Sequence, residues 1–381
     1  MFIHSLAVIK PLRENTVQER NLSNVPVMNK IAYLTFFAVL LFAACSKDES
    51  ISPVNGIPVV KAESSYTVLK EEDITYADGL SHNATSNSAF AIPLKLDLYY
   101  PDNNYSNRPV FMFIHGGGFR GGTKTKPEIV EMANYYASRG WVFASIDYRT
   151  LEELGIIQGM IPEQLYTYYS GIAPHEWIEN ALQGAQSADE VQQATAMYLA
   201  QRDAKAALRW IVANASTYNI NKDFITVGGA SAGAITTIAL GISNQEDFRD
   251  EITISDDPTL STTNLNESYT VRSMVYFWGS NIKLDVLEAV YDLNQYDRYD
   301  VSDPELFMGH GTAQDLVTPY EEALELQSIY NSLGVYNKLA TLTLPNGNPA
   351  GHGAWNGVVD GKGLSELTFD FIVERQNLSV E

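Results

Sequence analysis

Short apolar runs alternate along this chain with longer stretches in which apolar residues recur at helical spacing. Residues 94–101, LKLDLYYP, begin with leucine at every second position, the pattern of a half-buried strand. Residues 109–119 and 141–149 are almost continuously apolar, as expected for parallel strands buried on both faces. Similar apolar runs lie at 223–229, 271–279, 305–311 and 338–345, and helical spacing extends over 126–140, 187–214, 231–242, 319–333 and 364–375. This order predicts an α/β fold with an open, mostly parallel central sheet and helices on both faces.

Length and composition fit one large domain or two small ones. The chain has 381 residues, of which 45% are hydrophobic and 11% aromatic, and this is enough to form a full core. The net charge is -21, and without a basic stripe to neutralise phosphates we expect no nucleic-acid partner. We interpret the acidity as a solvated surface, with adaptation to a saline or polysaccharide-rich medium as the alternative.

The N-terminal region has the pattern of an export signal. Lys30 precedes an apolar stretch, 31–44, that is shorter than the roughly 20 residues of a membrane-spanning helix and suits a secretory signal peptide. Two alanines then precede Cys45, as in a bacterial lipobox, where the cysteine is lipidated, for example with palmitate, and becomes the mature N-terminus. Because Cys45 is the single cysteine, no internal disulfide is expected. An ordinary cleaved signal with an incidental cysteine is the alternative.

These features predict the organisation of the chain. Residues 1–27 lie upstream of the expected true start, and 28–44 form the lipoprotein signal peptide. Residues 45–65 are rich in Ser, Pro, Gly and charge without periodicity, and we interpret them as a flexible tether before one folded domain, 66–378. The acidic SKDES after the lipobox resembles an export signal to the outer membrane, so we expect a lipoprotein there, facing the cell exterior.

The stretch FITVGGASAGAITT, residues 224–237, places one serine among the smallest residues, directly after a strand pattern. A strand that passes through Ser231 into a helix needs a very sharp turn, and a side chain at Gly229 or Gly233 would collide with the neighbouring strand or helix. This G-x-S-x-G pattern is typical of a nucleophile elbow. A glycine-rich packing turn is the alternative.

A second glycine motif, HGGGF, ends the strand pattern at 109–119. Its consecutive glycines leave backbone amides unobstructed. The amides of Gly117 and Gly118, with that of Ala232, are therefore our candidates for an oxyanion hole. A flexible loop is the alternative for this motif taken by itself.

A serine nucleophile needs a base, and the base needs an orienting carboxylate. Where an elbow of this kind occurs, the chain order is Ser, then Asp or Glu, then His, and only His310 and His352 follow Ser231. We expect His352 to be the base and Asp315 the acid, because a strand pattern separates them and lets their loops converge from neighbouring strands. We expect His310 to position the acid loop and His115 to be structural. A buried His352 that is merely hydrogen-bonded is the alternative.

Together, HGGGF, SIDYR, RDAKAALRWI, ITVGGASAG, GTAQDLVTP and GHG resemble serine α/β-hydrolases of the carboxylesterase and hormone-sensitive-lipase type, close to bacterial feruloyl and acetyl esterases. The resemblance spans about residues 90–375. It implies the α/β-hydrolase fold, and it implies the same roles for Ser231, Asp315, His352 and the three oxyanion-hole residues. It also implies that Asp147, Arg149 and Asp203 form a structural charge cluster.

One departure from that family is the long stretch 150–186 between two predicted elements. Connections of this length are usually functional or disordered. We expect either a lid-like insertion that forms an acyl pocket or a packed insertion with its own small core. The candidate pocket residues are Phe119, Tyr166, Tyr168, Tyr169 and Trp177.

The function expected from the sequence is that of a carboxylic-ester hydrolase acting through an acyl-enzyme on a small ester or an acylated glycan carrying acetyl or feruloyl groups. Neither metal-binding, phosphate-binding nor dinucleotide motifs occur, so we expect no cofactor and no metal. A serine peptidase of the prolyl-oligopeptidase kind and a non-catalytic binding lipoprotein on a hydrolase scaffold are the alternatives. The acyl group, the alcohol and the oligomeric state are left open.

Overall fold

The computed structural model describes residues 56–381 except 84–87, 156–158, 160, 186 and 282–297. The predictions for the start of the chain, the signal peptide and Cys45 therefore lie outside the described residues. Among the helices that are described, none has the length and apolarity needed to cross a membrane.

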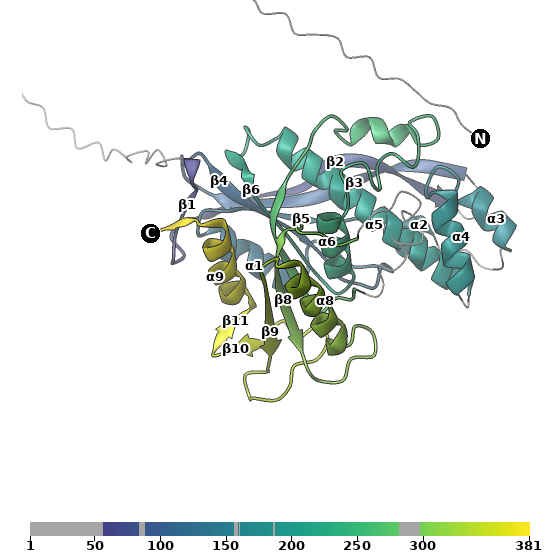
Figure 1. Cartoon of the computed structure of the whole chain (residues 1–381). Coiled ribbons are helices and arrows are strands. Elements are labelled where there is room, and N and C mark those ends of the chain that lie inside the picture. The colour runs from purple at the N-terminus through teal and green to yellow at the C-terminus, as the bar shows by residue number, and fades with distance from the viewer. Residues whose placement is uncertain (1–55, 84–87, 156–158, 160, 186, 282–297) are drawn as a thin grey trace, which may run out of the picture. The chain divides into compact units, whose positions relative to one another are not determined.

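Among the described residues, the main sheet has eight strands in the order β2-β3-β5-β4-β6-β7-β8-β9 (Figure 1). The strands are β2 (Val68–Asn83), β3 (Ser88–Pro101), β4 (Arg108–Ile114), β5 (Val142–Ile146), β6 (Ile220–Ala230), β7 (Val271–Phe277), β8 (Glu305–Gly311) and β9 (Asn337–Leu342). Strand β3 is antiparallel to both β2 and β5, and every pair from β5 to β9 is parallel. The expected mostly parallel sheet is confirmed.

The helices are α1 (Pro127–Ala137), α2 (Leu151–Leu154), α3 (Pro162–Tyr168), α4 (His175–Gly184), α5 (Ala188–Ala213), α6 (Ala232–Ile242), the 3-10 turn η2 (Pro258–Thr262), α8 (Tyr320–Leu333) and α9 (Leu364–Gln376). Helices α5, α6 and α8 share one hydrophobic cluster with the sheet, whereas α1 and α9 share a second cluster. Figure 1 shows α9 beside α1, and α8 against β8 and β9. The helices thus cover both faces of the sheet.

Beyond its first residue, strand β4 is continuously apolar because it lies in the centre of the sheet, where both of its faces are covered. Val110, Met112 and Ile114 contribute to the cluster with α5 and α6, while Phe111 and Phe113 contribute to the cluster with α1 and α9. Successive side chains of a strand point to opposite faces of the sheet. A central strand covered on both faces therefore needs apolar residues at every position.

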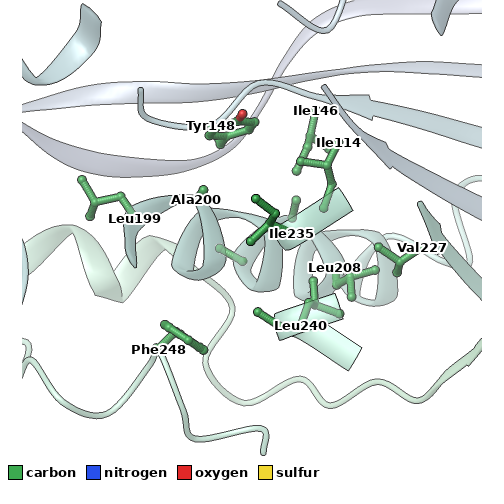
Figure 2. Packing of buried hydrophobic residues seen from close by; sticks show 14 of the residues in the cluster. Ile114, Ile146, Tyr148, Leu199, Ala200, Leu208, Val227, Ile235, Leu240 and Phe248 are labelled. Atoms are coloured by element: carbon green, nitrogen blue, oxygen red, sulfur yellow. The ribbon is translucent and has the colours of Figure 1, made fainter. Parts of the chain in front are cut away.

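Helix α6 lies between α5 and the sheet, and it is apolar nearly all round because neighbours surround it. Figure 2 shows Leu240 of this helix beside Leu208 of α5, and Ile235 belongs to the same cluster as Ile114 and Val227 of the sheet. The tight packing fixes the start of α6, and with it the turn that joins β6 to the helix.

Two parts of the fold carry no periodic signal in the sequence. Strand β2, VLKEEDITYADGLSHN, is rich in charge, and its long antiparallel pairing with β3 includes register shifts between Glu71 and Ile74 and between Thr75 and Ala77. The short β1 (Val59–Val60), inside the expected tether, pairs with β12 (Ser379–Val380). The ordered domain therefore begins earlier than expected. No local pattern marks β1 in the sequence, because a two-residue strand forms only by pairing with its distant partner.

The insertion 150–186 carries α2, α3 and α4, and the described part packs against the domain. Trp177 is fully buried, its ring lies 5.3 Å from that of Tyr198, and its indole N–H donates to the carbonyl of Ala194 at 2.7 Å. Tyr169 is fully buried as well. The described part of the insertion is therefore packed, and Tyr169 and Trp177 belong to the domain's main hydrophobic cluster.

Candidate active site

Ser231 occupies the turn between β6 and α6 and has an unusual backbone conformation. Its φ of 55° and ψ of -119° lie outside the regions that a residue with a side chain ordinarily adopts. Its N–H donates to the carbonyl of Phe277 in β7 at 2.9 Å, which anchors the turn to the neighbouring strand. Such strain persists only where the surrounding structure holds it, and it is common at functional sites.

The glycines beside Ser231 are required by close backbone contacts. A Cβ on Gly229 would lie 2.2 Å from the carbonyl oxygen of Gly233, and a Cβ on Gly233 would lie 2.0 Å from that of Ile114 in β4. Since both obstructing atoms belong to the backbone, no rotamer change relieves them. The predicted reason for the small residues is confirmed.

His352 connects Ser231 to Asp315. Its Nε2 lies 3.0 Å from Oγ of Ser231, and its Nδ1 lies 2.8 Å from Oδ2 of Asp315. Asp315 follows β8 and His352 follows β9, so both loops leave the same edge of the parallel sheet. With the proton on Nδ1 donated to the carboxylate, Nε2 is free to accept the serine proton.

The Asp315 carboxylate is held by its own loop. Oδ1 accepts hydrogen bonds from the backbone N–H groups of Val317 at 2.8 Å and Thr318 at 3.1 Å, and Oδ2 accepts the Thr318 hydroxyl at 2.8 Å. Burial by itself raises the pKa of the carboxyl, but hydrogen bonds from Thr318, Val317 and His352 outweigh burial and leave the pKa below its ordinary value. The group therefore stays ionised beside the imidazole.

His310 packs against the loop that carries Asp315, and its hydrogen bonds go to that loop and to Gly311 rather than to Ser231. It is buried, with Nε2 at 2.8 Å from the carbonyl oxygen of Thr318 and Nδ1 at 2.9 Å from that of Gly311. The structure thus places His310 against the loop that carries Asp315, where a residue that positions the acid loop is expected to lie.

The HGGGF loop, which follows β4, borders the same cavity as Ser231. Gly117 and Gly118 have φ of 136° and 62°, and a Cβ on Gly117 would lie 1.8 Å from the carbonyl oxygen of Gly121. Ala232 is the first residue of α6, so its N–H has no partner within the helix. Gly118, Ser231 and Ala232 line one cavity together. This arrangement leaves room for an oxyanion beside the serine.

His115, at the start of the same loop, is buried and makes its contacts with groups other than Ser231. Its Nδ1 lies 2.8 Å from the carbonyl oxygen of Gly116, its ring stacks on Tyr148 at 4.4 Å, and Nε2 lies 3.7 Å from Asp147. Burial lowers the pKa of the imidazole despite the nearby carboxylate. These contacts fit the structural role expected for His115.

The expected charge cluster consists of two separate parts. Arg149 and Asp203 form a buried, bidentate pair with a shortest distance of 2.6 Å. Asp147 instead accepts the backbone N–H of Lys124 at 2.6 Å and lies near His115. The first part connects α5 to the segment after β5 and to β2, through the bond from Arg149 to the carbonyl oxygen of Leu80.

Two cavities meet at the serine, and Gly118, Ser231 and Val317 line both of them. The first cavity, about 510 Å³, is mainly apolar and is lined further by Phe119, Trp177, Ala181, Ala194, Met197 and Ile235, with Asn180, Glu190 and Gln193 as polar members. The second cavity, about 560 Å³, is lined by His352, Thr123, Thr125, Lys126, Trp278 and Trp355. His352 lines only the second cavity, so the two sides of the serine differ chemically.

A third depression, here named the outer cavity, adjoins the second along Gly353 and Trp355. It measures about 560 Å³ and carries the carboxylates of Glu128, Glu131 and Glu366 together with the Tyr135 ring. The aromatic ring of Trp355 thus borders both spaces.

The candidate pocket residues differ in where they lie. Phe119 and Trp177 line the first cavity, whereas Tyr166, Tyr168 and Tyr169 line neither cavity at the serine. Tyr166 stacks on His175 at 4.3 Å, Tyr168 packs against His82 at 3.4 Å, and Tyr169 is buried. Tyr168 and Tyr169 belong to the domain's main hydrophobic cluster, and Tyr166 packs against it.

Several site residues were not identified from the sequence: Thr318, Gln193, Lys126, Trp278 and Trp355. Two of them carry a local signal, since Thr318 and Trp355 each follow a predicted triad member, Asp315 and His352, by three residues. Lys126, Gln193 and Trp278 belong to segments that are distant from Ser231 in the sequence. Within the part of the chain that the structure describes, no group of three or more His, Cys, Asp or Glu side chains is placed to hold a metal ion.

Comparison with known proteins agrees with this geometry. Residues 96–160 and 190–290 match the model of the BD-FAE family, an esterase family. A search of curated proteins found no match. Among solved structures, the apo form of Thermogutta terrifontis esterase 2 is 19% identical, covers 82% of this chain and 96% of its own, and gives a TM-score of 0.51.

Two further structures of the same kind give a similar result. The propionate-bound thermophilic esterase Est2 of Thermogutta terrifontis, a Planctomycetes species, is 18% identical, covering 81% of this chain and 94% of its own at a TM-score of 0.50. Thermogutta terrifontis esterase 2 phosphorylated by paraoxon is 19% identical, covers 80% of this chain and 94% of its own, and gives a TM-score of 0.50. The mostly parallel sheet with helices on both faces, together with these matches to esterases, is consistent with an α/β-hydrolase fold. The family match and the serine site together support a serine esterase.

Proposed function

We propose that this protein is a carboxylic-ester hydrolase in which Ser231 is the nucleophile, His352 the general base and Asp315 the orienting acid. The observation that carries the proposal is the bridge made by His352, with Nε2 at 3.0 Å from the serine hydroxyl and Nδ1 at 2.8 Å from the carboxylate. Nucleophile, base and orienting group are thus within hydrogen-bonding reach of one another.

In this mechanism Oγ of Ser231 attacks the ester carbonyl carbon while His352 takes the hydroxyl proton. The carbonyl oxygen becomes an oxyanion that accepts hydrogen bonds from the amides of Gly117, Gly118 and Ala232. The bond to the leaving oxygen then breaks, His352 returns the proton to that oxygen, and the alcohol departs. Water activated by His352 next attacks the acyl-serine, which releases the carboxylic acid and restores Ser231.

We assign the two cavities to the two halves of the ester from the position of His352. The imidazolium must reach the leaving oxygen, so the alcohol occupies the second cavity, which His352 lines. The acyl group then occupies the first cavity, where Phe119, Trp177 and Ile235 provide apolar walls. Its volume of about 510 Å³ admits acyl groups much larger than acetyl.

We further propose an acylated glycan as the substrate. On the alcohol side, Trp355 offers a ring to the second and outer cavities, and Glu128, Glu131 and Glu366 offer carboxylates to the outer one. Sugar hydroxyls donate to carboxylates, and the apolar face of a sugar ring packs on an aromatic side chain. A chain of sugars extending from the esterified unit would meet such groups.

The substrate proposal is tested with aryl esters of rising acyl length beside acetylated and feruloylated xylan fragments. We expect hydrolysis of the aryl esters, and a higher kcat/KM for the glycan esters than for methyl esters of the same acids. Peptide cleavage without ester cleavage would favour the peptidase alternative. Glycan binding without either activity would favour the binding lipoprotein.

We also propose that the enzyme is an outer-membrane lipoprotein anchored through Cys45, on the pattern LFAACSK alone. The test is labelling with radioactive palmitate in the native host. We expect label in the wild type and in the detergent-extracted membrane fraction, and none in Cys45→Ala. Unlabelled wild type would contradict the anchor without affecting the proposed chemistry.

A further inference from the structure

Gln193 of α5 connects the helix to the HGGGF loop through both ends of its side-chain amide. Nε2 donates to the carbonyl oxygen of Gly118 at 2.6 Å. Oε1 accepts a hydrogen bond from the guanidinium of Arg120 at 3.2 Å. Arg120 also pairs with Asp189, one turn earlier on α5, at 2.5 Å. Helix and loop are therefore joined next to Ser231.

The chemistry of the two partners fixes which way the Gln193 amide points. A guanidinium only donates, so the atom facing Arg120 must be the oxygen. A carbonyl only accepts, so the atom facing Gly118 must be the nitrogen. One orientation satisfies both contacts, and the reversed orientation satisfies neither.

Gly117 and Gly118 have positive φ and no side chain, so hydrogen bonds to their carbonyls are what restrict their peptide planes. The Gly117 carbonyl accepts the backbone N–H of Arg120 at 3.0 Å within the loop, whereas the Gly118 carbonyl is held from outside the loop by Gln193. The Arg120–Asp189 pair is about half exposed on both sides, and exposed pairs contribute little. The part-buried bond from Gln193 acts directly on the Gly118 carbonyl, one residue unit from the Gly118 amide.

We propose that Gln193 is a positioning residue for the oxyanion hole, and this inference rests on the proposed function. By holding the Gly118 carbonyl, Gln193 keeps the preceding Gly117 and Gly118 amides directed at the space beside Ser231. Its effect is exerted on the transition state, because only there does the substrate oxygen carry the charge that these amides bind.

Gln193 also lines the first cavity, so a simple role in contacting the acyl group must be separated from positioning. An acyl contact is made in the bound substrate as well as in the transition state, and its loss raises KM. A misdirected oxyanion amide lowers kcat and leaves KM nearly unchanged. The two roles therefore predict different kinetics.

The experiment uses two variants of the whole protein. Gln193→Met keeps the length of the side chain without either hydrogen bond. Gln193→Glu keeps an acceptor for Arg120 but turns a second oxygen toward the Gly118 carbonyl. Gln183→Met, on the exposed part of α4, is the matched control for the same chemical change. Circular dichroism and thermal unfolding establish that each variant is folded.

With an aryl acetate, we expect kcat to fall roughly tenfold to hundredfold in both Gln193 variants, less than the 10²–10³ lost when a donor is removed outright. KM should change less than about twofold. The affinity for a trifluoromethyl ketone, which forms a tetrahedral adduct with serine, should fall by the same factor as kcat/KM. Gln183→Met should match the wild type in all three quantities.

A raised KM with unchanged kcat and unchanged ketone affinity would overturn the inference and leave Gln193 as a wall of the acyl cavity. Unchanged values of all three would overturn it as well. Failure of the proposed function has a different signature, since the wild type would then hydrolyse no ester, or Ser231→Ala would remain fully active.

Discussion

The hydroxyl of Thr318 lies 3.0 Å from Nδ1 of His352. The same hydroxyl donates its one proton to Oδ2 of Asp315 at 2.8 Å, and the carbonyl oxygen of Trp278, 3.0 Å away, is its alternative acceptor. One buried hydroxyl thus contacts both members of the acid–base pair and connects them to the end of β7. The Thr318 hydroxyl therefore supports Asp315 and His352 in addition to the hydrogen bond between them.

Replacing Thr318 with valine should weaken this support while nearly preserving the shape of the residue. A hydrogen bond to a charged group contributes about 1.5–3 kcal/mol, so kcat/KM should fall roughly tenfold to hundredfold. Thr318→Ser, which keeps the hydroxyl, should remain within about threefold of the wild type. Steady-state kinetics of the three proteins measure the difference.

The same variant should change the pH dependence. The pKa of Asp315 lies below its ordinary value, so the carboxylate persists as pH falls and is lost only at the lowered pKa. Removing the Thr318 hydroxyl raises that pKa, so activity that depends on ionised Asp315 should be lost at a higher pH than in the wild type. Identical acid limbs in Thr318→Val and wild type would show that the hydroxyl does not act on Asp315.

Ser231→Ala should fold normally and lose ester hydrolysis by several orders of magnitude, because the nucleophile is absent while the backbone remains. A fluorophosphonate should label Ser231 alone in the wild type. Mass spectrometry of the labelled peptides locates the adduct. A label on another serine would end the assignment.

Substitutions at the two downstream histidines should have unequal effects. His352→Ala removes the group that lies 3.0 Å from the serine hydroxyl and should abolish nearly all turnover. His310→Ala acts only through the acid loop and should lower kcat/KM at most about a hundredfold, roughly 3 kcal/mol of barrier. Inactive His310→Ala beside active His352→Ala would contradict the proposed triad.

The two cavities at the serine should respond to substitution independently. Ala194→Phe fills the first cavity and should lower kcat/KM for esters of long acyl groups while sparing acetates. Trp355→Ala opens the alcohol side and should lower kcat/KM for glycan esters while sparing aryl acetates. The two variants are compared on one panel that varies acyl and alcohol separately. Exchanged phenotypes would reverse the assignment of the cavities.

Lys205 of α5 should make stability depend on pH. It is fully buried, it donates to the carbonyl oxygens of Asn244 and Asp247, and burial lowers its pKa to about 7. Between that value and the ordinary 10.5, the unfolded chain binds a proton that the folded chain lacks. From this group alone, the free energy of unfolding should therefore rise with pH, on the order of 1 kcal/mol per pH unit.

Urea unfolding of wild type and Lys205→Met from pH 6 to pH 9 measures this contribution. Groups that do not interact with Lys205 contribute equally to both curves, so the difference between the curves reports the lysine together with its coupling to Asp247. The wild type should gain stability relative to the variant as pH rises through 7. A constant difference would mean that Lys205 keeps its charge when folded.

The sequence by itself determined the features that depend on neighbours along the chain. The alternation of apolar runs predicted the sheet and its helices, because each strand such as β4 must bury both of its faces. The glycines around Ser231 predicted the elbow, since backbone atoms within a few residues and in the adjoining strand exclude any Cβ. The order of Ser231, Asp315 and His352 was also readable, because parallel strands bring their carboxyl ends to one edge.

Only the tertiary structure decided which distant side chains meet at that edge. Gln193, Trp355 and Thr318 contact the site through helix packing and loop paths. Tyr166, Tyr168 and Tyr169 instead pack with the domain's main hydrophobic cluster. Strand β2 formed despite its charged sequence because β3 offered a partner along its whole length. Periodicity records which face of an element is buried, but the partner on that face is selected by the packing of the whole domain.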